Sequence, residues 1–241
     1  MKLSTRTLVL GITASLLTLS LVASAQWKKP YTEWSEREAN KVLNDSPWGR
    51  TQAFASPVTL FRDMPNRGPI GEVGRSAPPN AININFRVRF LSAKPIRLAI
   101  SRLLELNQKG PISPELAKQL ETFRTGEFLE YIVVTVSCDS REAGANMREA
   151  LSLLYRSGTA DLKNDTFLEV KGGKRLFLQE YQPPKDDGVG ARFIFPRNVD
   201  GKPFITPESE EVRFFTELSS TYRLDRRYKV KDMIYEGKLE Y

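Results

Sequence analysis

The clearest pattern in the chain is a strict alternation of apolar and polar residues over positions 82–90. Isoleucine, phenylalanine and valine occupy every second position, and asparagine and arginine fill the positions between them. Successive side chains of a β-strand point to opposite faces, so this period of two predicts a strand with one face in the core and the other in water.

Three segments with apolar residues at helical spacing begin at recognisable start signals. Ser35 and Glu38 have the spacing of a capping box, which predicts a helix that begins at Glu36. Pro95 and Ser113 each mark the start of a further helix. We expect these last two helices to pack as a hairpin.

The segment 131–136 is apolar on both faces, which is typical of a central strand covered on each side. Asp139 and Glu142 again have the spacing of a capping pair and predict another helix. The rest of the chain is rich in strands, with a tight hairpin turn expected at Gly172-Gly173. The order of elements predicts an α+β fold: a mostly antiparallel sheet with about three helices packed on one face, plus a short N-terminal helical appendage.

The first 25 residues have the three parts of a secretory signal peptide: Lys2 and Arg6, an apolar run over 8–22, and small residues before Gln26. The run is shorter than the roughly twenty apolar residues of a bilayer span. We therefore expect cleavage near Ala25, an exported protein that is periplasmic or secreted, and no transmembrane segment in the mature chain. The expected organisation is a signal peptide over 1–25, a helical appendage over 26–61, a Pro- and Gly-rich linker over 62–80 and an α+β domain over 81–241.

Composition excludes several reaction classes. The chain has no histidine, which excludes Ser-His-Asp and Cys-His catalysis and histidine-ligated zinc. Its one cysteine, Cys138, has no partner for an intramolecular disulfide and follows an apolar run, so we expect a buried, inert thiol. The chain has neither a glycine-rich dinucleotide motif nor a Walker loop, and we expect no cofactor.

Carboxylates and aromatic residues remain as candidates for a site. Glu127 and Glu130 could form the acid/base pair of a glycoside hydrolase, although such a pair arises easily by chance. Consecutive carboxylates at 186–187 could belong to a Ca²⁺ loop, but the ligands of such loops alternate, which favours a solvated turn. Trp34 and Trp48 bracket the first helix; we expect both indoles to fill the core, with a sugar-stacking platform as the alternative.

The formal net charge is +7, from 36 basic and 29 acidic residues. Loss of Lys2 and Arg6 with the signal peptide would leave 34 basic residues and a net charge of +5. The basic residues form no block, so we expect no nucleic-acid partner. The last long strand should carry a basic strip on one face, formed by Arg223, Arg227, Lys229 and Lys231. This strip is either an anion-binding surface or simply the water-facing side of the strand.

Two stretches of sequence, one near each end of the chain, resemble those of a known family. One is Trp34-Ser-x-x-Glu followed by Val42-Leu43-x-Asp-Ser-Pro-Trp48, and the other is Lys231-Asp-Met-x-Tyr-x-Gly-Lys-Leu-Glu-Tyr241. They resemble a family of uncharacterised exported bacterial proteins of the acidobacterial type, which share this head and tail around a variable α+β middle. The resemblance implies a signal-bearing, single-domain protein and carries over no functional residue.

We expect a non-enzymatic binding or interaction protein whose partner is a polyanionic envelope component or another protein. The alternative is a histidine-free hydrolase that acts on envelope or extracellular glycans through carboxylates. A deep cleft lined by two carboxylates would favour the hydrolase, and a shallow basic or apolar surface favours binding.

Overall fold

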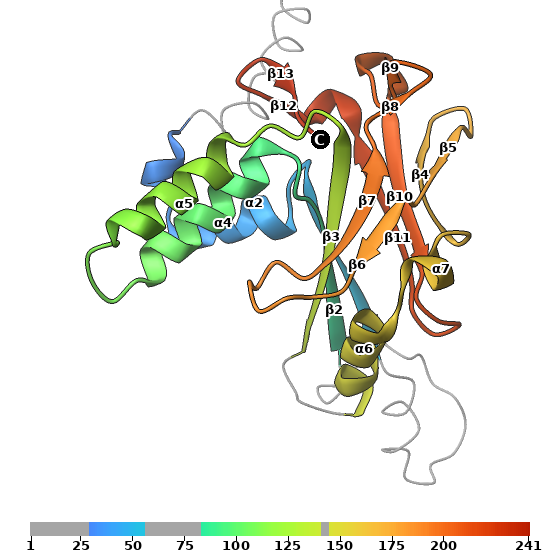
Figure 1. Cartoon of the computed structure of the whole chain (residues 1–241), viewed down its shortest axis with the longest axis horizontal. Coiled ribbons are helices and arrows are strands. Elements are labelled where there is room, and N and C mark those ends of the chain that lie inside the picture. The colour runs from blue at the N-terminus through green and yellow to red at the C-terminus, as the bar shows by residue number, and fades with distance from the viewer. Residues whose placement is uncertain (1–28, 56–82, 141–144) are drawn as a thin grey trace, which may run out of the picture.

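The computed structural model describes residues 29–55, 83–140 and 145–241. In this part of the chain two antiparallel sheets pack face to face, with helices beside them and across one end (Figure 1). The α+β class and the mostly antiparallel pairing expected from the sequence are confirmed. The described ranges contain five α-helices, where the sequence suggested about three.

The first sheet has the strand order β1-β2-β3-β7-β6. The alternating segment forms its second strand, in which Val88 lies opposite Val136 and Phe90 opposite Val134, all fully buried. The period of two therefore predicted this strand correctly. The strands are β1 (Gly49–Ala55), β2 (Asn83–Phe90), β3 (Tyr131–Ser140), β7 (Ala191–Pro196) and β6 (Glu180–Gln182).

The second sheet has the order β11-β10-β4-β5 and packs its apolar face on the first sheet. The ring of Phe214 meets those of Phe193 and Phe195 edge-on, with centroids 5.4 and 6.4 Å apart. Such aromatic pairs stabilise the contact beyond the area they bury. The strands are β11 (Arg223–Lys229), β10 (Glu211–Glu217), β4 (Thr166–Val170) and β5 (Arg175–Phe177).

The two sheets are joined along both sides. On one side, β5 runs directly into β6: the amide of Leu178 donates to Thr166 in the second sheet at 3.0 Å, and the next amide, of Gln179, donates to Ile194 in the first sheet, also at 3.0 Å. The chain that follows the Gly172-Gly173 turn is therefore bent between two sheets. On the other side, the edge strands β1 and β11 meet, and Gln52 of β1 connects them.

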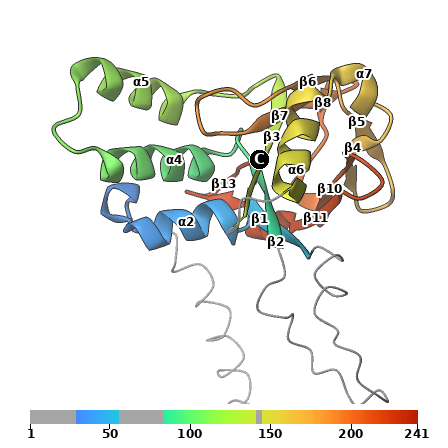
Figure 2. The same ribbon diagram turned by 90° about the horizontal axis from the view of Figure 1, so that it is seen from below.

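Helices α2 (Glu36–Asn44), α4 (Lys94–Asn107) and α5 (Pro114–Thr125) lie side by side, with α4 in the middle (Figure 2). The predicted capping box is present: the amide of Glu38 donates to Ser35 Oγ at 3.3 Å, and the amide of Ser35 donates to Glu38 Oε2 at 2.7 Å. Ser113 caps α5 by accepting from the amide of Leu116 at 3.2 Å. The start signals at Ser35 and Ser113 depend only on local geometry, and both are confirmed.

Helix α6 (Ala145–Arg156) lies elsewhere, across the lower end of the space between the sheets in Figure 1. The hydroxyl groups of Tyr181 and Tyr222 donate to its backbone carbonyls. The helices are thus not all packed on one face. Asp139 is not a helix cap either, because it lies within β3 and pairs with Arg87, while Glu142 falls outside the described residues.

The N-terminal segment shares the core of the sheets. Trp34 and Trp48 are 2% and 0% exposed, and both belong to the same hydrophobic core as β2 and β3. Nε1 of Trp48 donates to the carbonyl of Glu240 at 2.9 Å. The core-filling interpretation is confirmed and the sugar-stacking platform is wrong, because neither ring is accessible.

Several short elements lie between the long helices and strands of the described residues. Two small hairpins and three 3-10 turns connect the larger elements, and the helix α7 follows α6. None of the described helices is long and apolar enough to span a bilayer. The bounds are α7 (Thr159–Leu162), β8 (Asn198–Val199), β9 (Lys202–Pro203), β12 (Ile234–Tyr235), β13 (Lys238–Leu239), η2 (Tyr31–Glu33), η3 (Pro207–Ser209) and η4 (Val230–Asp232).

Candidate anion-binding site

The predicted basic strip is only partly on β11. Arg223, Arg227 and Lys229 are exposed on the outer face of this strand, while Leu224 and Tyr228 between them are fully buried. Lys231 is not on the strand, because β11 ends at Lys229 and the chain continues into the 3-10 turn η4. The predicted alternation is present in β11, but the basic strip on the strand ends at Lys229 and does not include Lys231.

Carboxylates from the neighbouring strand pair with the arginines of this strip. Arg223 contacts Glu217 at 2.8 Å, and Arg227 contacts Glu211 at 2.7 Å. Because β10 contributes a carboxylate beside each of these arginines, much of the positive charge of the strip is compensated within the sheet. The outer face alone is therefore a weak polyanion surface.

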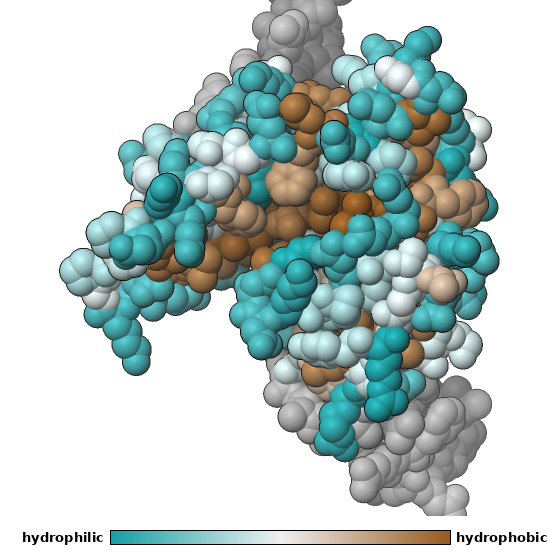
Figure 3. Space-filling model, in the orientation of Figure 1, coloured by the Kyte–Doolittle hydropathy of each residue, from teal (hydrophilic) through white to brown (hydrophobic). Residues whose placement is uncertain are grey.

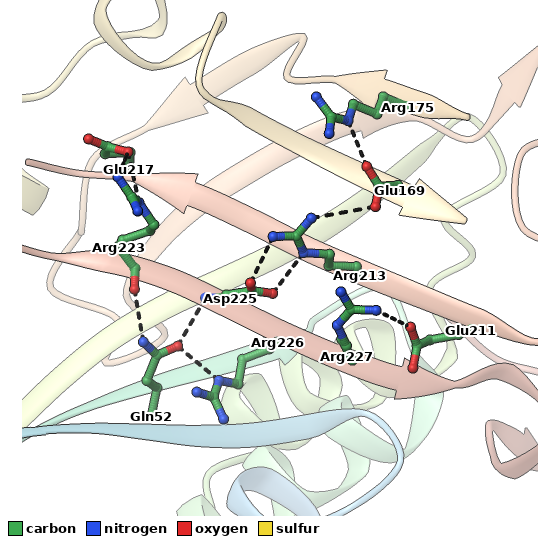
Figure 4. A network of polar contacts seen from close by, with 10 residues as sticks. All are labelled: Gln52, Glu169, Arg175, Glu211, Arg213, Glu217, Arg223, Asp225, Arg226 and Arg227. Atoms are coloured by element: carbon green, nitrogen blue, oxygen red, sulfur yellow. Dashed lines mark hydrogen bonds and ion pairs between the residues drawn. The ribbon is translucent and has the colours of Figure 1, made fainter. Parts of the chain in front are cut away.

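Arg213 is the centre of a charged network on the same face (Figure 4). Its Nε and Nη2 donate to the two oxygens of Asp225 at 2.8 and 2.7 Å, and its Nη1 lies 3.5 Å from Glu169. The hydrogen bonds from Arg213 hold the pKa of the Asp225 carboxyl below its usual value. Glu169 also pairs with Arg175 at 2.6 Å, and this hydrogen bond is the main cause of its lowered pKa.

A different, strongly cationic feature lies at the seam between β1 and β11. Arg50, Asp225, Arg226 and Arg227 line an open groove of about 480 Å³ there. Asp225 is the carboxylate among these residues, and Arg213 on the outer face already donates hydrogen bonds to both of its oxygens. Residues of two edge strands, three of them arginines, thus line one groove.

Gln52 holds this seam together. Its side-chain oxygen accepts from the amide of Asp225 at 3.0 Å and from Nε of Arg226 at 2.9 Å, and its Nε2 donates to the carbonyl of Arg223 at 2.8 Å (Figure 4). A guanidinium held at Nε keeps its two terminal nitrogens for other acceptors. Arg226 is therefore oriented without being neutralised.

The guanidiniums of the groove differ in how well they are compensated. Among the described residues no carboxylate is within ion-pair distance of Arg226. Arg50 is 3.5 Å from Asp45, whose side chain is 74% exposed, and an ion pair in this setting contributes little. Arg227 pairs with Glu211 at 2.7 Å. The groove therefore keeps a positive charge that concentrates at Arg226 and Arg50.

None of the other candidates from the sequence lines the groove. Burial raises the pKa of the Cys138 thiol to about 12, so it is not the thiolate of a nucleophile. Asp187 binds Arg192 and the amide of Val189, as expected for a turn, and the described residues contain no cluster of metal-ligating side chains. Glu127 and Glu130 are both exposed in the segment between α5 and β3.

An apolar hollow is visible on another face, between the α4–α5 hairpin and the strands of the first sheet (Figure 3). Elements around it carry large exposed apolar residues: Leu104 is 44%, Leu129 68% and Tyr131 39% exposed. This surface is chemically unlike the groove and shares no residue with it. The molecule thus presents a cationic and an apolar surface separately.

Comparisons with known proteins add no assignment: no family model, no curated protein and no solved structure matches this chain. The groove therefore has to be interpreted from its own residues. The sequence pattern did not single out Arg50, Gln52 and Arg226. A signal was available for Arg226, which lies between Leu224 and Tyr228 on the apolar face of the predicted strand. Arg50 and Gln52 gave none, because their places opposite Val88 and Phe86 follow from strand pairing.

Proposed function

We propose that this chain is an exported, non-enzymatic protein that binds an anionic envelope component through the groove between β1 and β11. The observation that carries the proposal is the presence of Arg50, Arg226 and Arg227 around one groove whose carboxylate is already bound by Arg213. Guanidinium groups match the geometry and charge of carboxylate, sulfate and phosphate groups. Fixing Arg226 through Gln52 lowers the ordering cost of binding.

Export is supported by the charged, apolar and small-residue parts of segment 1–25, which lies outside the described residues, and by the resemblance to exported proteins. N-terminal sequencing of the protein from a fractionated bacterial host tests it. We expect material outside the cytoplasm that begins at Gln26. A membrane-embedded product that retains Met1 would contradict export.

The groove favours binding over the hydrolase alternative. Hydrolysis by carboxylates requires two such groups on either side of the scissile bond. The groove contributes Asp225, and a carboxylate that is held by two hydrogen bonds from Arg213 is poorly suited to proton transfer. Release of reducing sugars from envelope glycans, lost in Asp225→Asn, would support the hydrolase instead.

Two charge reversals on the same strand test the proposal. Arg227 lines the groove, whereas the exposed Lys229 does not. We expect the wild-type protein to bind immobilised heparin or lipopolysaccharide and to elute above physiological salt. Arg227→Glu should abolish retention, and Lys229→Glu should lower it only slightly. Isolated surface changes usually move stability by about 0.5 kcal/mol, so both variants should fold.

Two results would overturn the proposal. If the wild-type protein passes through both columns at low salt, the groove does not bind polyanions. If the two reversals lower retention equally, the charge of the whole outer face matters and the groove has no special role.

A further inference from the structure

We propose that the groove recognises a phosphomonoester group, and not an extended polyanion that lies along β11. This inference rests on the proposed function and names the chemistry of its ligand. Three properties of the groove carry it: its uncompensated charge, the arrangement of carboxylates around it, and its size.

The uncompensated charge matches a compact dianion. Arg226 has no carboxylate partner within the described residues, and Arg50 has only a long contact to an exposed one. Arg227 and Asp225 are each paired, with Glu211 and Arg213. This leaves a charge of about +2, and a phosphomonoester carries roughly −1.5 to −2 at neutral pH. A carboxylate or a phosphodiester has only one negative charge and would leave one guanidinium unpaired.

The surroundings of the groove disfavour a long polyanion. Along the outer face of the sheet, Glu217 and Glu211 lie beside Arg223 and Arg227. An extended chain of regularly spaced anions would meet these carboxylates as well as the arginines. A single dense charge that enters the groove from the seam avoids them.

The groove, which is open to solvent, has room for more than a bare phosphate ion. Its volume of about 480 Å³ falls in the range of about 300–1,000 Å³ that is usual for small-molecule sites. A bare phosphate ion leaves most of this space to water. A phosphorylated sugar, either free or as the exposed headgroup of a lipid, fits the charge and the volume together.

Calorimetry on the mature chain tests the inference with two matched ligands. Glucose 1-phosphate supplies the monoester, and its methyl diester supplies the same sugar with one charge fewer. We expect the monoester to bind at least ten-fold more tightly than the diester. Arg226→Gln should weaken monoester binding by at least ten-fold. The matched control Arg223→Gln, on the same strand but outside the groove, should leave it within two-fold.

A second arm distinguishes the source of the phosphate. Co-sedimentation with phosphatidylcholine vesicles that contain phosphatidic acid would assign a lipid headgroup, and binding of glucose 1-phosphate without vesicle binding would assign a soluble or glycan-borne ester. Equal affinity for monoester and diester, or equal losses in Arg226→Gln and Arg223→Gln, would overturn the inference. Heparin retention without monoester binding overturns the inference alone, and loss of both overturns the proposed function too.

Discussion

The side-chain oxygen of Gln52 lies 2.9 Å from Nε of Arg226 and accepts a hydrogen bond from it, which links the edge strand of one sheet to the edge strand of the other. The same oxygen accepts from the amide of Asp225 at 3.0 Å. One glutamine therefore both closes the two-sheet structure and orients the least compensated arginine of the groove. The proposed function therefore predicts that stability and anion binding are coupled at this position.

Gln52→Ala tests this coupling. The change removes three hydrogen bonds across the seam and leaves the amide of Asp225 without its acceptor, so we expect a loss of about 1–3 kcal/mol in the free energy of unfolding. Heparin affinity should fall as well. Gln182→Ala on the edge strand β6 is the matched control, because its side-chain amide donates to the exposed carboxylate of Glu180 and not across the seam. Equal unfolding free energies for the two variants, measured in urea, would show that the seam is not held by Gln52.

Trp48 should be among the most sensitive positions of the core. Its indole is fully buried, donates to the carbonyl of Glu240 and packs edge-on against Tyr235 with ring centroids 6.2 Å apart. Trp48→Ala should cost about 3–5 kcal/mol in denaturant unfolding. Tyr155→Ala removes a ring that is 53% exposed and should cost far less. A loss within about 0.5 kcal/mol for Trp48→Ala would mean that the indole contributes nothing to the core.

The capping box of α2 predicts a dependence of stability on pH. Hydrogen bonds from Ser35, first from its backbone amide and then from its hydroxyl, lower the pKa of Glu38 from 4.5 to about 2. A carboxyl whose pKa is lowered by folding stabilises the protein above its unfolded pKa, and this contribution is lost as the pH falls from about 4.5 to 2. The stability difference between wild type and Glu38→Gln should therefore shrink over this window. A difference that stays constant from pH 6 to pH 2 would contradict the capping box.

Two glycines of the loop between β6 and β7 allow the cost of a left-handed backbone conformation to be measured separately from the cost of a steric clash. Gly188 and Gly190 both have positive φ angles, of 71° and 99°. A Cβ on Gly188 would meet nothing within 4 Å, whereas one on Gly190 would lie 2.5 Å from the carbonyl oxygen of Val136. Both alanine variants should lose about 1–2 kcal/mol for the left-handed conformation. Gly190→Ala should lose more than Gly188→Ala, and thermal unfolding of the pair checks the order.

Local signals predicted the elements well. The Ser35–Glu38 capping box, the Ser113 cap and the alternation of β2 all hold in the structure, because a cap and a period depend on residues close in sequence. Asp139 is the exception among the caps. It has the right spacing to Glu142, but long-range pairing of β3 with β2 places it in a strand beside Arg87.

The site was much less accessible to prediction. Arg50 and Arg226 are separated by most of the described chain and meet only because β1 and β11 become the facing edges of two different sheets. The sequence gives no rule for which strands are edges. The bend at Leu178 was equally hard to predict. The sequence does not show that the amide of Leu178 donates to one sheet and the amide of Gln179 to the other.

The most direct test of the account follows the arginine side chains themselves during binding. In a nitrogen-15-labelled chain without residues 1–25, titrated with glucose 1-phosphate, the Nε–Hε resonances of Arg50, Arg226 and Arg227 should shift together and saturate at one ligand per chain. The resonances of Arg175 and Arg223, which are paired with carboxylates outside the groove, should move little. Shifts that centre on Arg175 and Arg223 while Arg226 stays unchanged would contradict a binding site at the seam between β1 and β11.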